Sequence, residues 1–345
     1  MSQIQDRIKY SILDPTGNIT ALVETETEIA MQPAVADEIM KLHPEVEQVG
    51  FVRFETSGKA DVKSGSASTG QQFCDGELRM AGGEFCGNAT MSAAALLLMR
   101  AADGVSDIRK AGTDHADGGA WQTVYLKVSG ASDPVEVKLK PAEIDLKSID
   151  ACGPSFEAQV KMPPALGIEQ RAFSFAGKNG ELPLVRMEGI SHIIIGENSP
   201  FFGMKDEPEE AEQAVRQWCK ELAVDGLGLM FLEAEPADWT FQMTPLVYVP
   251  AGSSSGTVFW ENSCASGSAA AGMYLISGQT SAQELNPAPG RGAGETRNPT
   301  TEQTPVQTQK AIVRLREPGG LLMVECDFAA GFGNVLLHGR VSRIQ

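Results

Sequence analysis

Short segments in which apolar and polar residues alternate recur along the chain and predict β-strands. They are rich in β-branched residues and end at Gly, Pro or Asp, as strands joined by turns do. The expected strands are Lys9–Ile12, Asn18–Glu24, Val49–Arg53, Thr123–Val128, Val135–Leu139, Ala158–Met162, Ser191–Ile195, Leu227–Leu232, Thr240–Val249, Ala311–Leu315, Leu321–Glu325 and Asn334–Ser342.

Helical periodicity is found in fewer segments, and these are of two kinds. Ala34–Leu42 and Glu209–Leu222 have one apolar face and one polar face, which is typical of helices on the surface of a fold. Asn88–Arg100 and Ser266–Ile276 consist of small and apolar residues with almost no charge. A helix of that composition is expected inside the fold.

The two chargeless helices belong to a weak internal repeat. The segment CGNATMSAAALL begins at Cys86, and the similar segment CASGSAAAGMYL begins at Cys264. A glutamate precedes each cysteine by two or three residues, Glu84 in the first copy and Glu261 in the second. We therefore predict an α+β fold of two pseudo-symmetric domains, each a mostly antiparallel sheet wrapped around a central helix.

The repeat also predicts where the domains divide. Residues 1–165 and a returning C-terminal strand at 334–345 form the first domain, and residues 166–333 form the second. The polar stretches 101–119 and 281–309 are expected to be excursions, since Gly, Pro, Asp, Thr and Gln dominate them.

Composition and charge exclude several classes of protein. The formal net charge is −17, and such a surface repels nucleic-acid phosphates and anionic lipids. No apolar run reaches the roughly 18 residues that a membrane span requires. The start of the chain has no apolar signal core, so we expect a cytoplasmic location. The six cysteines form no C-x-x-C pair, which argues against a metal site or a disulfide scaffold.

Cys86 and Cys264 are the candidate chemical groups, because each is predicted to begin a buried helix. Backbone N–H groups at a helix start stabilise a thiolate, so we expect a lowered thiol pKa. With the two helix starts face to face, one thiolate removes an α-proton and the other thiol returns a proton to the opposite face. A single buried cysteine is more often a small apolar residue. We assign that structural role to Cys74, Cys152, Cys219 and Cys326.

The residues that follow each cysteine are candidate carboxylate-binding groups. Gly87 and Asn88 in the first copy, and Ala265 and Ser266 in the second, have small side chains that let a substrate approach the backbone. The N–H groups of a helix start bind a carboxylate well.

The motifs MAGGEFCGNATMS and WENSCASGSAA resemble the two cysteine motifs of the diaminopimelate epimerase superfamily of cofactor-independent racemases. PTGNIT resembles the N-terminal substrate loop of that family, here Gly17 and Asn18. The stretches EQVGF, KVSGASD, PLVYVP and EPGG are most similar to the histidine racemase branch, which serves staphylopine-type metallophore synthesis. The resemblance implies a two-domain fold, two catalytic cysteines and no cofactor, pyridoxal phosphate included.

Departures from diaminopimelate epimerases bear on the substrate. Those enzymes have an ERGxGET-type segment directly before the second cysteine, and its arginine binds the distal carboxylate. Here SSSGTVFWENS precedes Cys264 and contains no arginine; the similar GRGAGET at 290–296 is interpreted as coincidence. The distal asparagines are also absent from GISH at 189–192 and from LGLMF at 227–231. An amino acid with a single carboxylate is therefore favoured.

Four further residues are candidate substrate ligands beside Asn18. Glu47 could pair with a basic side chain such as imidazole, and Gln48 could hydrogen-bond the amino-acid head. The alternative for both is a solvated strand end. Glu261 and Glu84 could hold the α-ammonium or tune the thiols, or either could simply cap a helix; Glu261 is favoured. His192, in an apolar segment, is interpreted as a packed core residue.

The sequence thus favours a cofactor-independent amino-acid racemase or epimerase, with histidine as the leading substrate. The alternatives are a diaminopimelate epimerase, an isomerase of another amino acid or α-acidic carboxylate, and a non-catalytic binding protein on the same scaffold. We expect the protein to bind a small amino acid and to bind neither nucleic acid nor membranes. The sequence does not distinguish a homodimer from a monomer.

Overall fold

The computed structural model describes residues 8–54, 74–103, 121–142, 154–235, 239–250, 256–285, 310–327 and 334–344. Cys152, residues 104–119 and residues 286–309 lie outside the described residues, so most of both predicted excursions is not described. The first residues of each excursion are helical: 101–102 end one helix and 281–285 end another.

The described residues form mostly strands, with a few helices between them. The strands are β1 (Tyr10–Pro15), β2 (Thr20–Val23), β3 (Gln48–Phe54), β4 (Gly76–Met80), β5 (Gln122–Val128), β6 (Val135–Pro141), β7 (Ser155–Met162), β8 (Gly167–Phe175), β9 (Lys178–Arg186), β10 (Ser191–Gly196), β11 (Leu227–Ala234), β12 (Thr240–Val249), β13 (Thr257–Trp260), β14 (Lys310–Glu317), β15 (Gly320–Asp327) and β16 (Val335–Arg343). The helices are η1 (Ile29–Met31), α1 (Gln32–Leu42), α2 (Gly87–Ala102), η2 (Phe202–Asp206), α3 (Pro208–Leu222) and α4 (Ala265–Leu285). The mixed α+β class is confirmed, and every predicted strand and helix overlaps one of these elements.

Four strands were not predicted: β4, β8, β9 and β13. β8 lies at the end of the sheet path, and most of its residues are exposed on both faces. Such a strand has no buried face, so its sequence lacks the alternation that marks other strands. β13 pairs only along the last residues of β12 and is too short to show a pattern.

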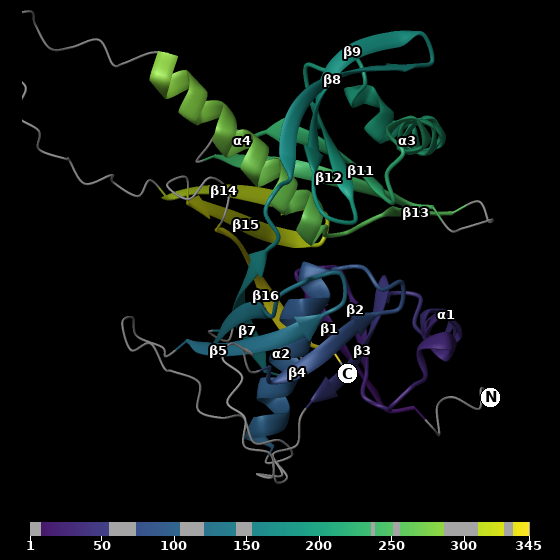
Figure 1. Ribbon diagram of the computed structural model, residues 1–345, viewed down its shortest axis with the longest axis vertical. Coiled ribbons are helices and arrows are strands. Elements are labelled where there is room, and N and C mark those ends of the chain that lie inside the picture. The colour runs from purple at the N-terminus through teal and green to yellow at the C-terminus, as the bar shows by residue number, and fades with distance from the viewer. Residues whose placement is uncertain are drawn as a thin grey trace, which may run out of the picture.

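The N-terminal strands close into a ring around α2. Strands β1 to β7 pair in order, and β16 pairs with β7 on one side and with β1 on the other. α2 contacts every strand of this ring, and its residues Gly87–Met99 are buried (Figure 1). The small side chains of this helix explain how it fits inside, because Ala and Gly let the strands approach closely.

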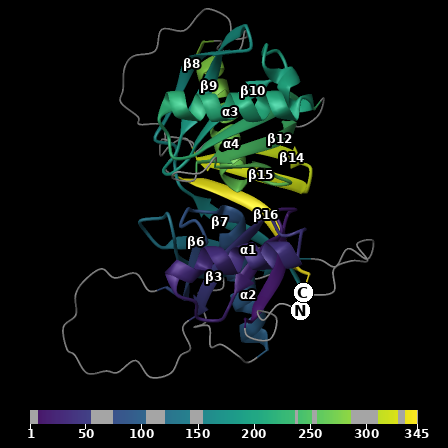
Figure 2. The ribbon, with the colours of Figure 1, turned by 90° about the vertical axis from the view of Figure 1, so that its right-hand side faces the viewer.

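The second part of the sheet continues from β16 through β15, β14, β12, β11, β10, β9 and β8. α4 packs against β9, β10, β11, β14, β15 and β16. α1 and α3 lie on the same side of the molecule, one over each part of the sheet (Figure 2). α3 buries Trp218 on its apolar face among Phe173, Phe175 and Phe201.

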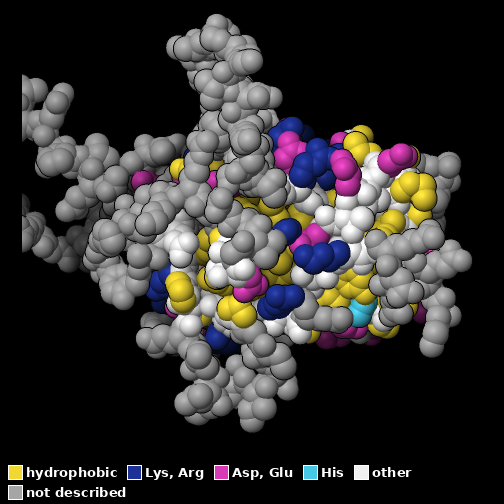
Figure 3. Space-filling view, turned by 90° about the horizontal axis from the view of Figure 1, so that it is seen from below, with side chains coloured by type: hydrophobic (Ala, Val, Ile, Leu, Met, Phe, Trp, Pro, Cys, Tyr) yellow, Lys and Arg dark blue, Asp and Glu magenta, His cyan; other side chains and the backbone are white. Residues whose placement is uncertain are grey.

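The described side chains on one face of the molecule are mixed in charge (Figure 3). On the face shown in Figure 3, basic and acidic side chains lie next to one another, so the described part of this face has no large patch of one charge. None of the helices in the described residues is both long and apolar enough to cross a membrane.

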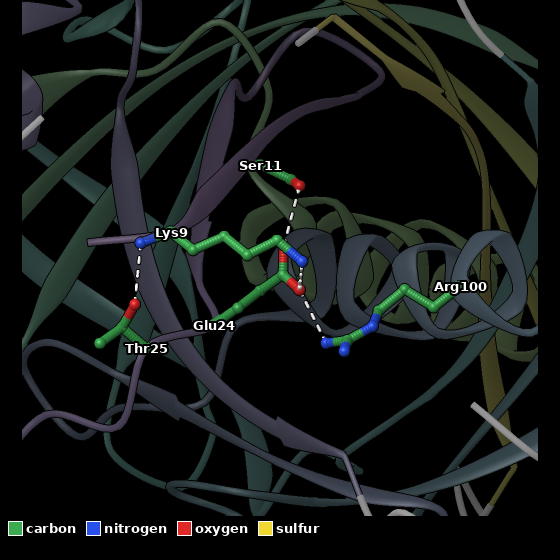
Figure 4. Close-up of polar contacts among 5 residues, drawn as sticks. All are labelled: Lys9, Ser11, Glu24, Thr25 and Arg100. Carbon is green, nitrogen blue, oxygen red and sulfur yellow. Dashed lines mark hydrogen bonds and ion pairs between the residues drawn. The ribbon is translucent and has the colours of Figure 1, made fainter. Parts of the chain in front are cut away.

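A buried carboxylate fixes the C-terminal end of α2 to the ring. Glu24 follows β2, and its side chain is only 4% exposed. It accepts hydrogen bonds from Arg100 at 2.7 Å, from Lys9 at 3.1 Å and from Ser11 at 3.2 Å (Figure 4). Two cations therefore balance one buried charge, which is the condition for a buried ion pair to be tolerated.

Candidate active site

Cys86 is the N-cap residue of α2. Its backbone is extended (φ −134°, ψ 115°), and its Sγ accepts a hydrogen bond from Ala89 N at 3.4 Å. Thr90, one turn later, donates from its hydroxyl to the Cys86 carbonyl at 2.6 Å. The extended backbone turns the thiol toward the unpaired N–H groups of the first helical turn, as predicted.

Cys264 has the same position at the start of α4. Its Sγ accepts from Gly267 N at 3.4 Å, and its carbonyl accepts from Ser268 N at 2.8 Å. The Ser266 Oγ lies 3.7 Å from the Cys264 sulfur. Both cysteines therefore begin buried helices, which confirms that part of the prediction from the internal repeat.

The two helix starts are in contact with each other. Asn88 Nδ2 donates to the Ser263 carbonyl at 3.2 Å, across the boundary between the two parts of the sheet. A Cβ on Gly87 would lie 3.0 Å from the Ala265 Cβ and 2.9 Å from the Met162 sulfur. Only glycine fits this place without displacing a neighbour, so the sequence GN after Cys86 is what lets the helices meet end to end.

Gln48 contacts the Cys86 thiol directly. The thiol donates to Gln48 Oε1 at 2.9 Å, and Gln48 Nε2 donates to Thr20 Oγ1 at 2.7 Å. The Thr20 hydroxyl in turn donates to the Asn18 carbonyl at 2.9 Å. This chain of hydrogen bonds fixes which atom of the Gln48 amide faces the sulfur.

Glu47 joins residues that are far apart in the sequence. Asn18 Nδ2 donates to Glu47 Oε2 at 2.7 Å, while the Asn262 backbone N donates to Oε2 at 3.4 Å and its side chain donates to Oε1. Burial raises the pKa of Glu47, although the hydrogen bonds from Asn262 and Asn18 lower it. Asn262 was not predicted, since one asparagine in WENSC carries no distinguishing signal.

Glu317 is the second residue of this region that the sequence did not identify. It ends β14, it is 4% exposed, and its Oε2 accepts from the Cys264 backbone N at 2.6 Å. Its Oε1 accepts from the Ser268 hydroxyl. The Glu261 carboxylate acts on the Cys264 thiol and raises its pKa.

The expected lowering of the thiol pKa is wrong for the unliganded protein. Burial raises the pKa of Cys86 to about 12, and the Glu261 and Glu84 charges add to this effect. Burial raises the pKa of Cys264 well above its usual value, with Glu261 and Glu317 as further causes. The N–H groups of the helix starts lower both values, but desolvation and nearby carboxylates outweigh them.

The carboxyl groups themselves are hard to ionise. Burial raises the pKa of Glu261 to about 7, with the charges of Glu47 and Glu84 as further causes. Burial raises the pKa of Glu317 to about 8, with the charge of Glu261 as a further cause. Both values lie near neutral pH, which is the range that acid–base chemistry uses.

Several polar atoms around the helix starts are buried and unpaired. Within the described residues, Asn88 Oδ1, Ser263 Oγ and Trp260 Nε1 have no hydrogen-bond partner. Buried polar groups are normally paired, so these atoms are available to a ligand. His192 is fully buried, and burial lowers its pKa to about 3, so it is a neutral core residue as predicted.

Comparison with known proteins identifies the family. The family model "Histidine racemase CntK N-terminal domain" matches residues 7–292. A histidine racemase of Fusobacterium nucleatum subsp. nucleatum (strain ATCC 25586) is 29% identical over 279 residues, covering 79% of this chain and 81% of that protein. A histidine racemase of Staphylococcus aureus (strain Mu50) is 26% identical over 271 residues, covering 77% and 79%.

A solved structure shares the fold. The crystal structure of a probable proline racemase from Agrobacterium radiobacter K84, with bound carbonate, aligns with 97% of this chain and 90% of its own at a TM-score of 0.52 and 10% identity. The extent of the family match decides the classification: the chain belongs to the histidine racemase CntK N-terminal domain family.

Proposed function

We propose that this isomerase is a histidine racemase that inverts the α-carbon with two thiols, Cys86 and Cys264, and without a cofactor. The family and its curated relatives support an amino-acid racemase. The observation that carries the two-thiol mechanism is the contact between the two helix starts, each of which holds one cysteine.

The reaction needs a base on one face of the α-carbon and an acid on the other. One thiolate takes the α-proton, and the opposite thiol then gives its proton to the other face. The negative charge that develops on the substrate carboxylate is stabilised by backbone N–H groups at Gly87 and Asn88 and at Ala265 and Ser266. Such preorganised donors are worth most in a buried site.

The charge around the thiols favours a cationic substrate. The charged groups that act on the two thiols are Glu84, Glu261 and Glu317, and all are acidic. An α-ammonium and a protonated imidazole would neutralise part of this charge and so lower both thiol pKa values, since an opposite charge nearby favours the thiolate. A second carboxylate, as in diaminopimelate, would be repelled.

Glu47 is proposed to bind the imidazole, with Asn18 and Asn262 holding its carboxylate in place. Glu261 is proposed to bind the α-ammonium, and Gln48 to orient the Cys86 thiol. The unpaired Asn88 Oδ1 and Ser263 Oγ would complete the contacts to the amino-acid head.

We further propose that the two parts of the sheet are pseudo-symmetric domains, with residues 1–165 and 334–345 in one and 166–333 in the other. The pairing pattern supports this division. Parallel pairs β2–β3 and β4–β5 in the first part correspond to β10–β11 and β12–β14 in the second. In each part, the first pair is connected through a surface helix and the second through a cysteine-bearing helix.

The test is incubation of the purified protein with single L-amino acids in D2O. We expect histidine to lose its α-proton fastest and to yield the D-enantiomer, with no effect of hydroxylamine, which traps pyridoxal phosphate. Efficient turnover of LL-diaminopimelate with none of histidine would exclude the proposed substrate. A requirement for added pyridoxal phosphate would exclude the mechanism.

A further inference from the structure

Glu317 lies at the turn between β14 and β15, where its carboxylate meets the start of α4. It is the residue before Pro318, Gly319 and Gly320, and it pairs with Gly320 across the hairpin. The turn brings a strand-end glutamate 53 residues after Cys264 in the sequence back to that cysteine.

Both oxygens of Glu317 are occupied by the first turn of α4. Oε2 accepts the Cys264 backbone N–H at 2.6 Å, and Oε1 accepts the Ser268 hydroxyl. The carboxylate thus caps the helix from outside, and the Cys264 amide is bound by the protein itself. When Glu317 is ionised, it is a charged acceptor for a helix N–H group, and such hydrogen bonds are among the stronger ones in proteins.

The start of α2 is built differently at the equivalent positions. Thr90 occupies the place that Ser268 has in α4, but its hydroxyl donates to the Cys86 carbonyl of its own helix. The partner of the Cys86 thiol is the neutral amide of Gln48. Glu317 is not among the charged groups that act on Cys86, which are Glu261 and Glu84.

The same turn also holds the loop before Cys264 at a second point. Gly319 N donates to the Asn262 carbonyl at 2.8 Å. A Cβ on Gly319 would overlap Gly17 Cα, so the turn is wedged between the loop that carries Asn18 and the loop that carries Asn262. Movement of this turn would therefore displace Cys264 and the residues around Glu47 together.

We propose that Glu317 is a positioning residue for Cys264: it fixes the cysteine backbone at the start of α4 and places next to this thiol a carboxylate that Cys86 lacks. Both thiols are protonated near neutral pH in the free enzyme, and they then differ in the carboxylates that act on them. The inference rests on the proposed function in so far as it takes Cys264 to be an acid–base group.

The two thiols differ in the charged groups that act on them. Glu261, from the loop before α4, acts on both thiols, while Glu317 from β14 acts on Cys264 and Glu84 acts on Cys86. Glu317 ionises near pH 8, whereas Glu261 ionises near pH 7. As the pH rises from about 7.5 to 9.5, Glu317 therefore becomes ionised and adds a negative charge that acts on Cys264.

The test is the pH dependence of thiol modification in the full-length free enzyme, which requires no turnover. Methyl methanethiosulfonate is reacted with the protein at several pH values from 7.5 to 9.5, and the modified peptides of Cys86 and Cys264 are quantified by mass spectrometry. The readout is the ratio of the two modification rates. A fixed difference in accessibility between the two thiols would change this ratio by the same factor at every pH, so it cannot produce a pH dependence.

In the wild-type protein we expect the rate ratio of Cys264 to Cys86 to fall about threefold as the pH passes through the ionisation of Glu317. A nearby like charge raises a thiol pKa by about one unit, and the higher nucleophilicity of the more basic thiolate offsets part of the tenfold loss. In Glu317→Gln the ratio should stay constant, because the amide keeps the shape and can accept from Cys264 N and donate to Ser268 Oγ without a charge.

Glu325→Gln is the matched control, since Glu325 lies on β15, pairs with His338 at 3.4 Å and is not among the charged groups that act on either thiol. It should behave as the wild type. A ratio that does not change with pH in the wild type, or that changes equally in Glu317→Gln, would overturn the proposal. If instead Cys264→Ser retained racemisation, the proposed function would fail while the modification result stood.

Discussion

Burial affects the two cysteines more strongly than their position at helix N-termini. The N–H groups of Ala89 and Gly267 stabilise the thiolates, yet burial raises the pKa of Cys86 to about 12 and raises that of Cys264 well above its usual value. Cys86 keeps part of its surface accessible, whereas Cys264 is only 4% exposed. Both thiols are therefore protonated near neutral pH in the free protein, and the proposed cationic substrate would favour their ionisation.

The buried carboxyls make stability depend on pH. The pKa of Glu317 is raised to about 8 in the folded protein, so the folded state binds this proton more tightly than the unfolded state does. Its contribution to stability is complete below the usual glutamate pKa of about 4.3 and is lost as the pH rises through 8. Urea denaturation at pH 5 and pH 9 should show the wild type losing more unfolding free energy than Glu317→Gln, by on the order of 3 kcal/mol. Equal losses in both proteins would contradict a raised pKa.

Glu47 provides the residue-scale test of substrate choice. Glu47→Gln removes the charge that is proposed to bind imidazole but keeps an oxygen for Asn18. A charge-assisted hydrogen bond contributes about 1.5–3 kcal/mol, so kcat/KM for histidine should fall about 10- to 100-fold, and the value for alanine should fall less. The control is Glu45→Gln. Glu45 is the exposed ion-pair partner of His43, so this change should leave kcat/KM for histidine and for alanine unchanged. An equal loss of kcat/KM for histidine and alanine would show that Glu47 does not recognise the substrate side chain.

At the scale of elements, the two cysteine-bearing helices were predictable and the turn that supports one of them was not. Small chargeless residues after Cys86 and Cys264 identify helices that must be buried, because no polar face is left for solvent. Glu317 has no such signal, since a strand-end glutamate before Pro-Gly-Gly has the composition of an ordinary exposed turn. Its role depends on a contact between segments that the sequence separates. The pKa of the thiols was mispredicted for a related reason, because local sequence shows the helix start but not the desolvation.

The far end of α2 offers a test of what anchors this helix. Glu24→Ala leaves Arg100 without its partner at 2.7 Å and should lower the free energy of unfolding by about 3 kcal/mol, as breaking a buried ion pair does. Because Arg100 is about 21 Å along the helix from Cys86, kcat/KM should be nearly unchanged. Chemical denaturation and steady-state kinetics measure the two quantities.

Glu26→Ala is the control for this change. Glu26 pairs with Arg53 at 2.8 Å, but both side chains are largely exposed, so the loss should stay below about 1 kcal/mol. A loss as large as that of Glu24→Ala would mean that burial is not what gives the Glu24 contacts their strength.

At the scale of the whole molecule, the sheet brings two distant parts of the chain to one site. β16, from the C-terminus, pairs with β7 and β1 and also with β15, so it links the ring around α2 to the strands that α4 covers. The starts of α2 and α4 meet at this junction. The sequence indicated the C-terminal return through its last alternating segment, but the closure of the ring by β1 and β16 is a long-range pairing that no local pattern encodes. The homodimer and the cytoplasmic location remain predictions.

The central claim is that Cys86 and Cys264 act as a pair on opposite faces of the α-carbon. The most direct measurement is α-proton exchange and racemisation of L- and D-histidine in D2O by Cys86→Ser and Cys264→Ser. A hydroxyl is a far weaker base than a thiol, so racemisation should fall at least about 10³-fold in each variant. Exchange without inversion should survive for one enantiomer only, and that enantiomer should differ between the two variants. Cys219→Ser and Cys326→Ser, away from the helix starts, should leave turnover intact. Near wild-type racemisation by either Cys86→Ser or Cys264→Ser would contradict the two-thiol mechanism.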